Sequence, residues 1–294
     1  MNSSPAHNIL IIGATGQQGR SVIAALLHQH HEVDGSSPQN GTKFEKIFAL
    51  TRSKESRQAK ELASSSSAIH LVAGDLADPE AIFSAVGEPV WDLYSVQINA
   101  NAEETQGIEL VNAALRHGVR HFVYASGDRG GPVKSDTNPT PVRNFRAKFN
   151  IENHLKAVCL QSTSAMTFTI LRPVTFFENL GGELHGRGFA RMWEQMGHKG
   201  KKLQFVATKD IGWFAAQSFA NPESTTFRNQ AVTLVGDELT QEEAEIIFRK
   251  AMNGHSMPLA PCPIGSMVKW DKKDTVGDMF ELFEKEGIAG HGEL

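Results

Sequence analysis

Three glycines near the start of the chain have a spacing that suits phosphate binding. Residues 8–19 read N-I-L-I-I-G-A-T-G-Q-Q-G, with a glycine at every third position of the turn. In such turns the first glycine permits the tight bend, the second lets the backbone approach a pyrophosphate, and the third lets the next helix pack closely. The N-terminus of that helix faces the phosphate charge. We therefore expect dinucleotide contacts from Gly13, Thr15, Gly16, Gln17, Gln18 and Gly19. The alternative is a glycine-rich turn in an unrelated α/β protein.

The elements around this turn have the order of a nucleotide-binding βαβ unit. Residues 9–12 form a short apolar run that predicts a strand buried on both faces, and residues 20–29 have the apolar pattern of a helix. Further strands are predicted at 46–50, 69–73, 91–96, 121–125 and 167–171, with helical segments between them. This alternation predicts an α/β fold with a doubly wound parallel sheet, the Rossmann fold.

The chain length of 294 residues fits one large α/β domain, or a nucleotide-binding domain with a smaller lobe. We predict a first domain over 1–172, to which a strand near 231–235 returns, and a substrate lobe over 173–294. The polar stretch 31–43 is predicted to be a surface loop. Asp210 is expected to cap a helix that runs to Ala220, and Thr240 to begin another helix with a capping box.

The second predicted strand has a basic end, which bears on the choice of cofactor. NAD-binding folds usually place an acidic residue at this position to hold the ribose 2′-hydroxyl. Here the strand runs into Arg52 and Lys54. A planar guanidinium suits phosphate oxygens, so we expect Arg52 to pair with a 2′-phosphate and Lys54 to assist. The alternative is that Arg52 is only a solvated residue at a strand end.

The next two strands also end in candidate cofactor contacts. Asp75 and Leu76 follow the third strand, where a polar edge and an apolar side chain could meet the adenine. Asp75 could equally cap the helix that begins near Pro79. The fourth strand ends at Gln97, a further candidate contact.

Composition excludes several classes of protein. The formal net charge is −4 and the sequence pI is about 6.3, which argues against a broad nucleic-acid surface. Apolar stretches are too short to span a bilayer, and the first residues lack the pattern of a signal peptide. Cys159 and Cys262 have no metal-ligand spacing, so we expect neither a metal site nor a disulfide framework. A cytoplasmic location is expected, or a nuclear one if the protein is regulatory.

Several short motifs occur in the order that is typical of one family. They read G-A-T-G-Q-Q-G, A-L-T-R, A-G-D-L, R-H-F-V-Y-A-S, R-A-K-F-N-I-E and L-R-P-V-T-F-F-E-N-L. This ordered set, from about residue 9 to residue 252, resembles the NmrA-like proteins, which are atypical short-chain dehydrogenases/reductases. The resemblance implies binding of NADP(H) in preference to NAD(H). Some members of that family are reductases, and others are dinucleotide-sensing regulators.

The resemblance also marks where the catalytic centre departs from the usual pattern. Typical short-chain reductases carry Tyr-x-x-x-Lys on a helix, which places both side chains on one face. Lys148 resembles that lysine, but Asn144 stands where the tyrosine would be, and an amide cannot act as an acid. Ser126 is the candidate hydroxyl after the fifth strand and is followed by Gly127. Relatives similar to isoflavone reductase function with a lysine alone, so Lys148 is our candidate proton-transfer residue. It could instead only contact the cofactor, or pair with Glu152.

An aromatic segment follows the strand that ends at Arg172. Phe176, Phe177 and Asn179 are candidate pocket residues because they come directly after a sheet strand, although packing of a small lobe would also explain them. Two functions stay open. The first is an NADP-dependent oxidoreductase that acts on an apolar or aromatic small molecule. The second is an NADP(H) sensor that binds a protein partner. Under both hypotheses we expect a monomer or homodimer without direct nucleic-acid or membrane contact.

Overall fold

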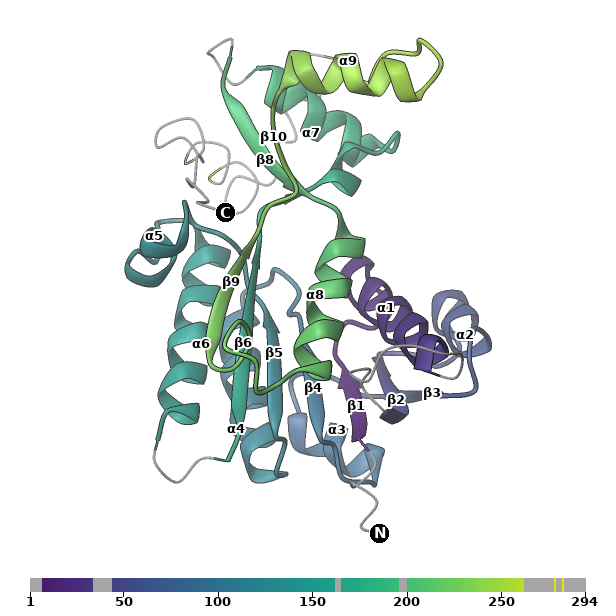
Figure 1. Ribbon diagram of the computed structural model, residues 1–294, viewed down its shortest axis with the longest axis vertical. Coiled ribbons are helices and arrows are strands. Elements are labelled where there is room, and N and C mark those ends of the chain that lie inside the picture. Colours follow the sequence, from purple (N-terminus) through teal and green to yellow (C-terminus); the bar gives the residue numbers. More distant parts are fainter. Residues whose placement is uncertain are drawn as a thin grey trace. The chain divides into compact units, whose positions relative to one another are not determined.

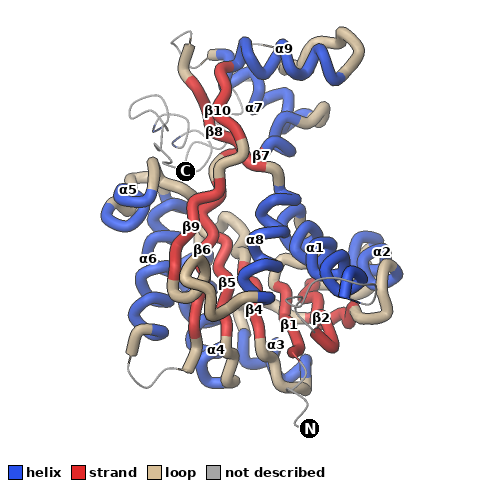
Figure 2. Tube along the Cα trace, in the orientation of Figure 1, coloured by secondary structure: helices blue, strands red, loops and turns tan. Residues whose placement is uncertain are grey.

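A computed structural model describes residues 7–33, 44–161, 165–195 and 200–261, together with Asp278 and Leu282. The chain divides into two compact units (Figures 1 and 2). Unit 1 comprises Met1–Ser126, Asn150–Arg172 and Thr208–Val232, and unit 2 comprises Gly127–Phe149, Pro173–Ala207 and Thr233–Leu294. The linear boundary after residue 172 stays a prediction. Most of the predicted loop at 31–43, and Cys262 with the C-terminal tail, lie outside the described residues.

The main sheet has the strand order β3-β2-β1-β4-β5-β6-β9. Its strands are β1 (His7–Ile11), β2 (Phe44–Thr51), β3 (Ile69–Ala73), β4 (Asp92–Ser95), β5 (His121–Ala125), β6 (Thr167–Pro173) and β9 (Gln230–Leu234). All neighbouring pairs from β3 to β6 are parallel. This confirms the predicted α/β fold with a doubly wound parallel sheet. The order reverses between β1 and β4, the place where ligands bind at the carboxyl ends of such strands.

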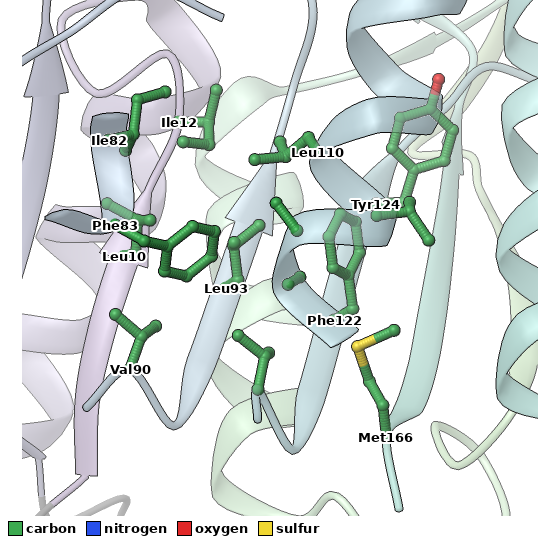
Figure 3. Close-up of a cluster of buried hydrophobic side chains, with 14 of the residues drawn as sticks. Leu10, Ile12, Ile82, Phe83, Val90, Leu93, Leu110, Phe122, Tyr124 and Met166 are labelled. Carbon is green, nitrogen blue, oxygen red and sulfur yellow. The ribbon is translucent and has the colours of Figure 1, made fainter. Parts of the chain in front are cut away.

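Helices cover both faces of this sheet. They are α1 (Gln17–Val33), α2 (Arg57–Ser64), α3 (Pro79–Val86), α4 (Glu103–Arg116), α6 (Arg143–Cys159) and α8 (Thr208–Ala220). Figure 3 shows the core on one face, where Leu10 and Ile12 pack with side chains of α3 and α4. Because successive strand residues point to opposite faces, Ile9 and Ile11 face the other side. The buried residues of α1 and α8 do not belong to the core that contains Leu10 and Ile12. These two helices lie side by side (Figure 1).

Unit 2 contains a small sheet with the order β10-β8-β7. Its elements are α5 (Pro132–Thr137), β7 (Thr175–Phe176), the 3-10 helix η1 (Phe177–Leu180), α7 (Leu184–Glu194), β8 (Lys202–Val206), β10 (Asp237–Thr240) and α9 (Gln241–Ala251). Trp193 and Phe205 lie in its core, with ring centroids 5.0 Å apart. Thr240 and Glu243 form the predicted capping box of α9. No helix in the described ranges is long and apolar enough to cross a bilayer.

Three local predictions were wrong in detail. The helix predicted to be capped by Asp210 begins two residues earlier, at Thr208, so Asp210 lies in the first turn. The carboxylate that caps α3 belongs to Asp78, which accepts from the Ala81 backbone, and not to Asp75. The predicted loop at 31–43 begins too early, because α1 extends to Val33.

Candidate functional site

The glycine turn after β1 has a shape that leaves its middle open. Gly13 has a φ of +72°, a conformation that residues with a side chain rarely adopt. A Cβ on Gly19 would lie 2.7 Å from the Ala14 Cα, so the third glycine permits close packing of α1 on the turn. Gly16 donates its backbone N–H to the Gly13 carbonyl at 2.9 Å and is exposed. An added Cβ on Gly16 would have a single close neighbour, the Gly13 oxygen at 3.3 Å. Among the described residues that do not adjoin Gly16 in the chain, no other atom lies within 4 Å of the added Cβ.

The polar residues of this turn have different surroundings. Gln17 begins α1 and is exposed, and Thr15 is half-buried. The Thr15 carbonyl accepts from Arg20 Nε at 3.1 Å, which ties the turn to the helix. Gln18 Oε1 accepts from the Tyr94 hydroxyl at 3.1 Å. Burial raises the pKa of Tyr94, so this hydroxyl stays protonated and remains a donor.

Replacing Gly16 by alanine tests the role of this open space. The protein should stay folded, because the neighbouring oxygen at 3.3 Å needs to yield only slightly. We expect dinucleotide binding to weaken by about tenfold or more, since the methyl group would occupy the position at which such glycine turns admit a pyrophosphate. Isothermal titration calorimetry with NADPH measures the effect, and circular dichroism checks the fold. Unchanged affinity would mean that the nucleotide binds elsewhere.

Two basic side chains lie at the carboxyl end of β2. Arg52 and Lys54 are both exposed, and neither has a hydrogen bond or ion pair to another residue in the described ranges. Asp75, at the end of β3, is exposed and accepts from the Ala77 backbone at 2.9 Å. Leu76 is half-buried against the sheet core. These side chains follow neighbouring strands, so they lie along one edge of the sheet.

Gln97 follows β4 and has a buried acceptor without a partner. Its side-chain Nε2 donates to Ser95 Oγ at 2.6 Å. Its Oε1 has no hydrogen-bond partner among the described residues, although Gln97 is buried. Buried polar atoms in proteins are nearly always hydrogen-bonded, so this oxygen is suited to a donor from a bound molecule. The open glycine turn and this oxygen fit a dinucleotide at the β1–β4 switch point.

Ser126, at the end of β5, belongs to a buried charged network within unit 1. Its hydroxyl donates to Glu152 on α6. Glu152 also accepts from Arg172, with Nη2 and Oε2 2.5 Å apart, and both charged side chains are only 1% exposed. The network ties the ends of β5 and β6 to α6. The Ser126 hydroxyl therefore donates its hydrogen bond to Glu152. This contact was not part of the role predicted for Ser126, that of the candidate hydroxyl after the fifth strand.

Lys148 and Asn144 lie one turn apart on α6, within unit 2. Both are buried, and Lys148 is 8% exposed. Gly127 lies beside this lysine, since a Cβ there would be 3.7 Å from Lys148 Cδ, an ordinary contact distance. The Asn144 Oδ1 is buried and has no partner in the described part of the chain. The lysine and the amide thus stand on one helix face, as the spacing predicted.

The loop after Gly127 is braced by two buried charged residues. The Asp128 carboxylate accepts from the backbone N–H groups of Gly130 and Gly131 at 2.8 and 2.9 Å. Arg129 donates from Nη1 to the Gly127 carbonyl at 3.1 Å and lies over the Phe149 ring. Of these contacts, the Arg129 bond holds the backbone of Gly127, the position beside Lys148. The sequence does not predict this role of Asp128 and Arg129, because charged residues after a strand are common in solvent-exposed loops.

The aromatic pocket candidates belong to unit 2 and are half-buried. Phe176 lies in β7, which pairs with β8. Phe177 stacks on Phe205 with ring centroids 5.1 Å apart, so it serves the core of the small sheet. Asn179 lies on η1. Packing explains one side of Phe177, and a pocket role for Phe176, Phe177 and Asn179 stays a prediction.

The chain is similar to proteins of one family. A model of the NmrA-like family matches residues 5–286. An NmrA-like domain protein of Dictyostelium discoideum is 26% identical over 58% of this chain, and pinoresinol reductase 2 of Arabidopsis thaliana is 25% identical over 82%. The chain spans 52% of the first relative and 73% of the second.

Solved structures share the fold at lower identity. The NADPH complex of a quinone oxidoreductase from Escherichia coli has a TM-score of 0.66 and 21% identity, over 95% of this chain and 90% of that one. The NADP complex of NmrA, a negative transcriptional regulator, has a TM-score of 0.64 and 17% identity, over 96% and 82%. Both likenesses concern the fold.

Proposed function

This chain belongs to the NmrA-like family, and from that premise we propose that it binds NADP(H) and transfers hydride to an apolar or aromatic small molecule. One observation carries the proposal: the turn after β1 is open at Gly16, where phosphate oxygens would meet backbone N–H groups. The nicotinamide supplies the hydride when bound. A small-molecule substrate, a cytoplasmic location and a monomeric or homodimeric state belong to the same proposal.

The basic end of β2 supports a preference for NADP(H). Arg52 and Lys54 are exposed and engage no other described residue, so a ligand phosphate would not have to displace an existing partner. A guanidinium can form two parallel hydrogen bonds to phosphate oxygens. The quinone oxidoreductase of E. coli is known with NADPH, whereas NmrA is known with NAD and with NADP. These complexes support a nicotinamide dinucleotide as the ligand, and the β2 end is our argument for its phosphorylated form.

We expect Arg52→Ala to weaken NADPH binding by about 1–3 kcal/mol, the range for a charge-assisted hydrogen bond. NADH binding should hardly change, because NADH has no 2′-phosphate. Calorimetric titration of both cofactors tests this expectation. Arg57→Ala is a matched control, since Arg57 is exposed on α2 and pairs with Glu61. Equal affinities of the unmodified protein for NADPH and NADH would refute the preference.

Within unit 2, Lys148 is the proposed proton-transfer residue. It is a buried ionisable side chain one turn from Asn144 on α6, and it lies beside the braced Gly127. Asn144 has no proton to give at neutral pH, so its role would be to orient a substrate or water through its amide. Lys148 would deliver a proton to the substrate atom that becomes basic when hydride arrives.

A second function is favoured by one specific observation. Asn144 replaces an acid, and the neighbouring Gly127 carries no hydroxyl, so a chain of this kind could bind the cofactor without turnover. The protein would then report the NADP(H) state to a protein partner. Absorbance at 340 nm, followed with quinones, enones and aromatic carbonyls, separates the two functions. NADPH oxidation supports the oxidoreductase. Absence of oxidation with every substrate, together with cofactor-dependent binding of a partner, supports the sensor.

A further inference from the structure

Helix α8 contacts the first part of α1 backbone to backbone. A Cβ on Gly212 would fall on the Ser21 carbonyl group and would lie 2.9 Å from the Val22 nitrogen. The hydroxyl of Ser21 also donates to Thr208 Oγ1 at 3.3 Å. Gly212 and Thr208 are buried. Ser21 is one turn from Gln17, where α1 begins, so α8 contacts α1 directly behind the glycine turn.

The start of α1 is therefore held from two sides within unit 1. On one side, the missing side chain of Gly19 lets the helix approach the turn at Gly13 and Ala14. On the other side, the missing side chain of Gly212 lets α8 approach Ser21. A side chain at either glycine would displace the helix, because the atoms in the way belong to the backbone.

The two helix N-termini differ in charge. α1 has no acidic residue in its first turn, so its partial positive charge is available to an anion. α8 has Asp210 in its first turn, where the carboxylate offsets the partial charge of that helix. Of the two N-termini, that of α1 is therefore better suited to an anion.

We propose that α8 is a positioning element for the pyrophosphate: Gly212 and Thr208 hold α1 where its N-terminus meets the phosphates. This inference rests on the proposed dinucleotide binding. It is distinct from the choice between NADP(H) and NAD(H), which concerns Arg52, and from proton transfer, which concerns Lys148. It predicts that loosening the contact between α8 and α1 weakens the binding of ligands that carry a pyrophosphate and leaves the binding of other ligands unchanged.

The test compares three ligands by calorimetry. NADPH carries both the pyrophosphate and the 2′-phosphate, ADP carries only the pyrophosphate, and adenosine 2′-phosphate carries only the 2′-phosphate. We expect Gly212→Ala to weaken the affinity for NADPH and for ADP by about 10- to 100-fold, because a methyl group would be forced into a closed contact. Adenosine 2′-phosphate should bind as before. Arg52→Ala should give the opposite pattern and weaken NADPH and adenosine 2′-phosphate.

Gly107→Ala is a matched control for the effect of the substitution on folding. Gly107 is a buried helical glycine of unit 1 whose added Cβ would meet Ile151 Cγ1 at 2.7 Å, away from α1. The Gly107→Ala substitution should leave the affinity for ADP unchanged. If the Gly212→Ala variant does not fold, Thr208→Val tests the inference in its place, because valine has the size of threonine but cannot accept from Ser21. Thr208→Ser keeps the hydroxyl and should bind ADP like the unmodified protein.

The outcomes separate the inference from the function on which it rests. If the unmodified protein binds neither NADPH nor ADP, the proposed function fails. If it binds both, and Gly212→Ala and Thr208→Val bind ADP as tightly as it does, the positioning role of α8 is overturned. Equal weakening of ADP and adenosine 2′-phosphate would also overturn it, because a general loosening of unit 1 would then explain the loss.

Discussion

Replacing Lys148 by alanine is expected to slow hydride transfer by about 100- to 10,000-fold at saturating NADPH, the usual contribution of a positioned proton donor. The lysine is buried on α6 and lies beside Gly127, whose backbone is braced by Arg129. The stem of the lysine therefore packs beside a fixed stretch of backbone. Asn144→Ala should have a smaller effect, because an amide only orients its partner.

Cofactor affinity has to be measured with the rate, because a lysine that only holds the ribose would lower activity through binding. The informative result is a large fall in kcat with an unchanged Kd for NADPH. Lys156→Ala is the matched control, since Lys156 lies two turns further along the same helix. A Lys148→Ala enzyme with full kcat would exclude the proposed proton transfer. A fall that disappears at higher NADPH would assign Lys148 to cofactor binding alone.

The glycine turn could be predicted from sequence because its geometry is local. Gly13 has a positive φ, and Gly19 lies against the backbone of Gly13 and Ala14. These residues lie within six positions of each other in the chain. The parallel sheet was predictable for a similar reason: each buried strand appears as a short apolar run. The caps were less certain, since Asp75 and Asp78 stand three residues apart and both precede Pro79. Only the backbone conformation shows that Asp78 caps α3, while Asp75 closes a turn at Ala77.

Other parts of the site depend on residues far apart in the chain. Gly212 appears in sequence as one small residue in an apolar helix, and its need for a missing side chain arises only where Ser21 meets it. The Gln97 oxygen becomes notable only when its surroundings are known to offer no donor. Helical spacing suggests Lys148 as the partner of Glu152. Its actual partners, Ser126 and Arg172, lie at the ends of β5 and β6, which the spacing of one helix cannot reveal.

Breaking the Arg172–Glu152 pair should lower the stability of the protein more than any other substitution described for unit 1. We expect Arg172→Met to lower the free energy of unfolding by about 3–5 kcal/mol, because Glu152 would remain as an uncompensated buried charge. The structural reason is the burial of both side chains at 1% exposure, with the Ser126 hydroxyl as a further donor. Urea unfolding followed by tryptophan fluorescence measures the change.

The double variant Arg172→Met/Glu152→Gln distinguishes a lost attraction from an isolated charge. The glutamine side chain can still accept from Ser126 and carries no charge, so the double variant should recover much of the lost stability. Arg116→Met is the control for an exposed pair, since Arg116 and Glu80 lie on the surface, and it should cost less than about 1 kcal/mol. If Arg172→Met costs no more than this control, Glu152 is solvated or protonated in the folded protein. The network at the ends of β5 and β6 would then not be what holds this part of α6.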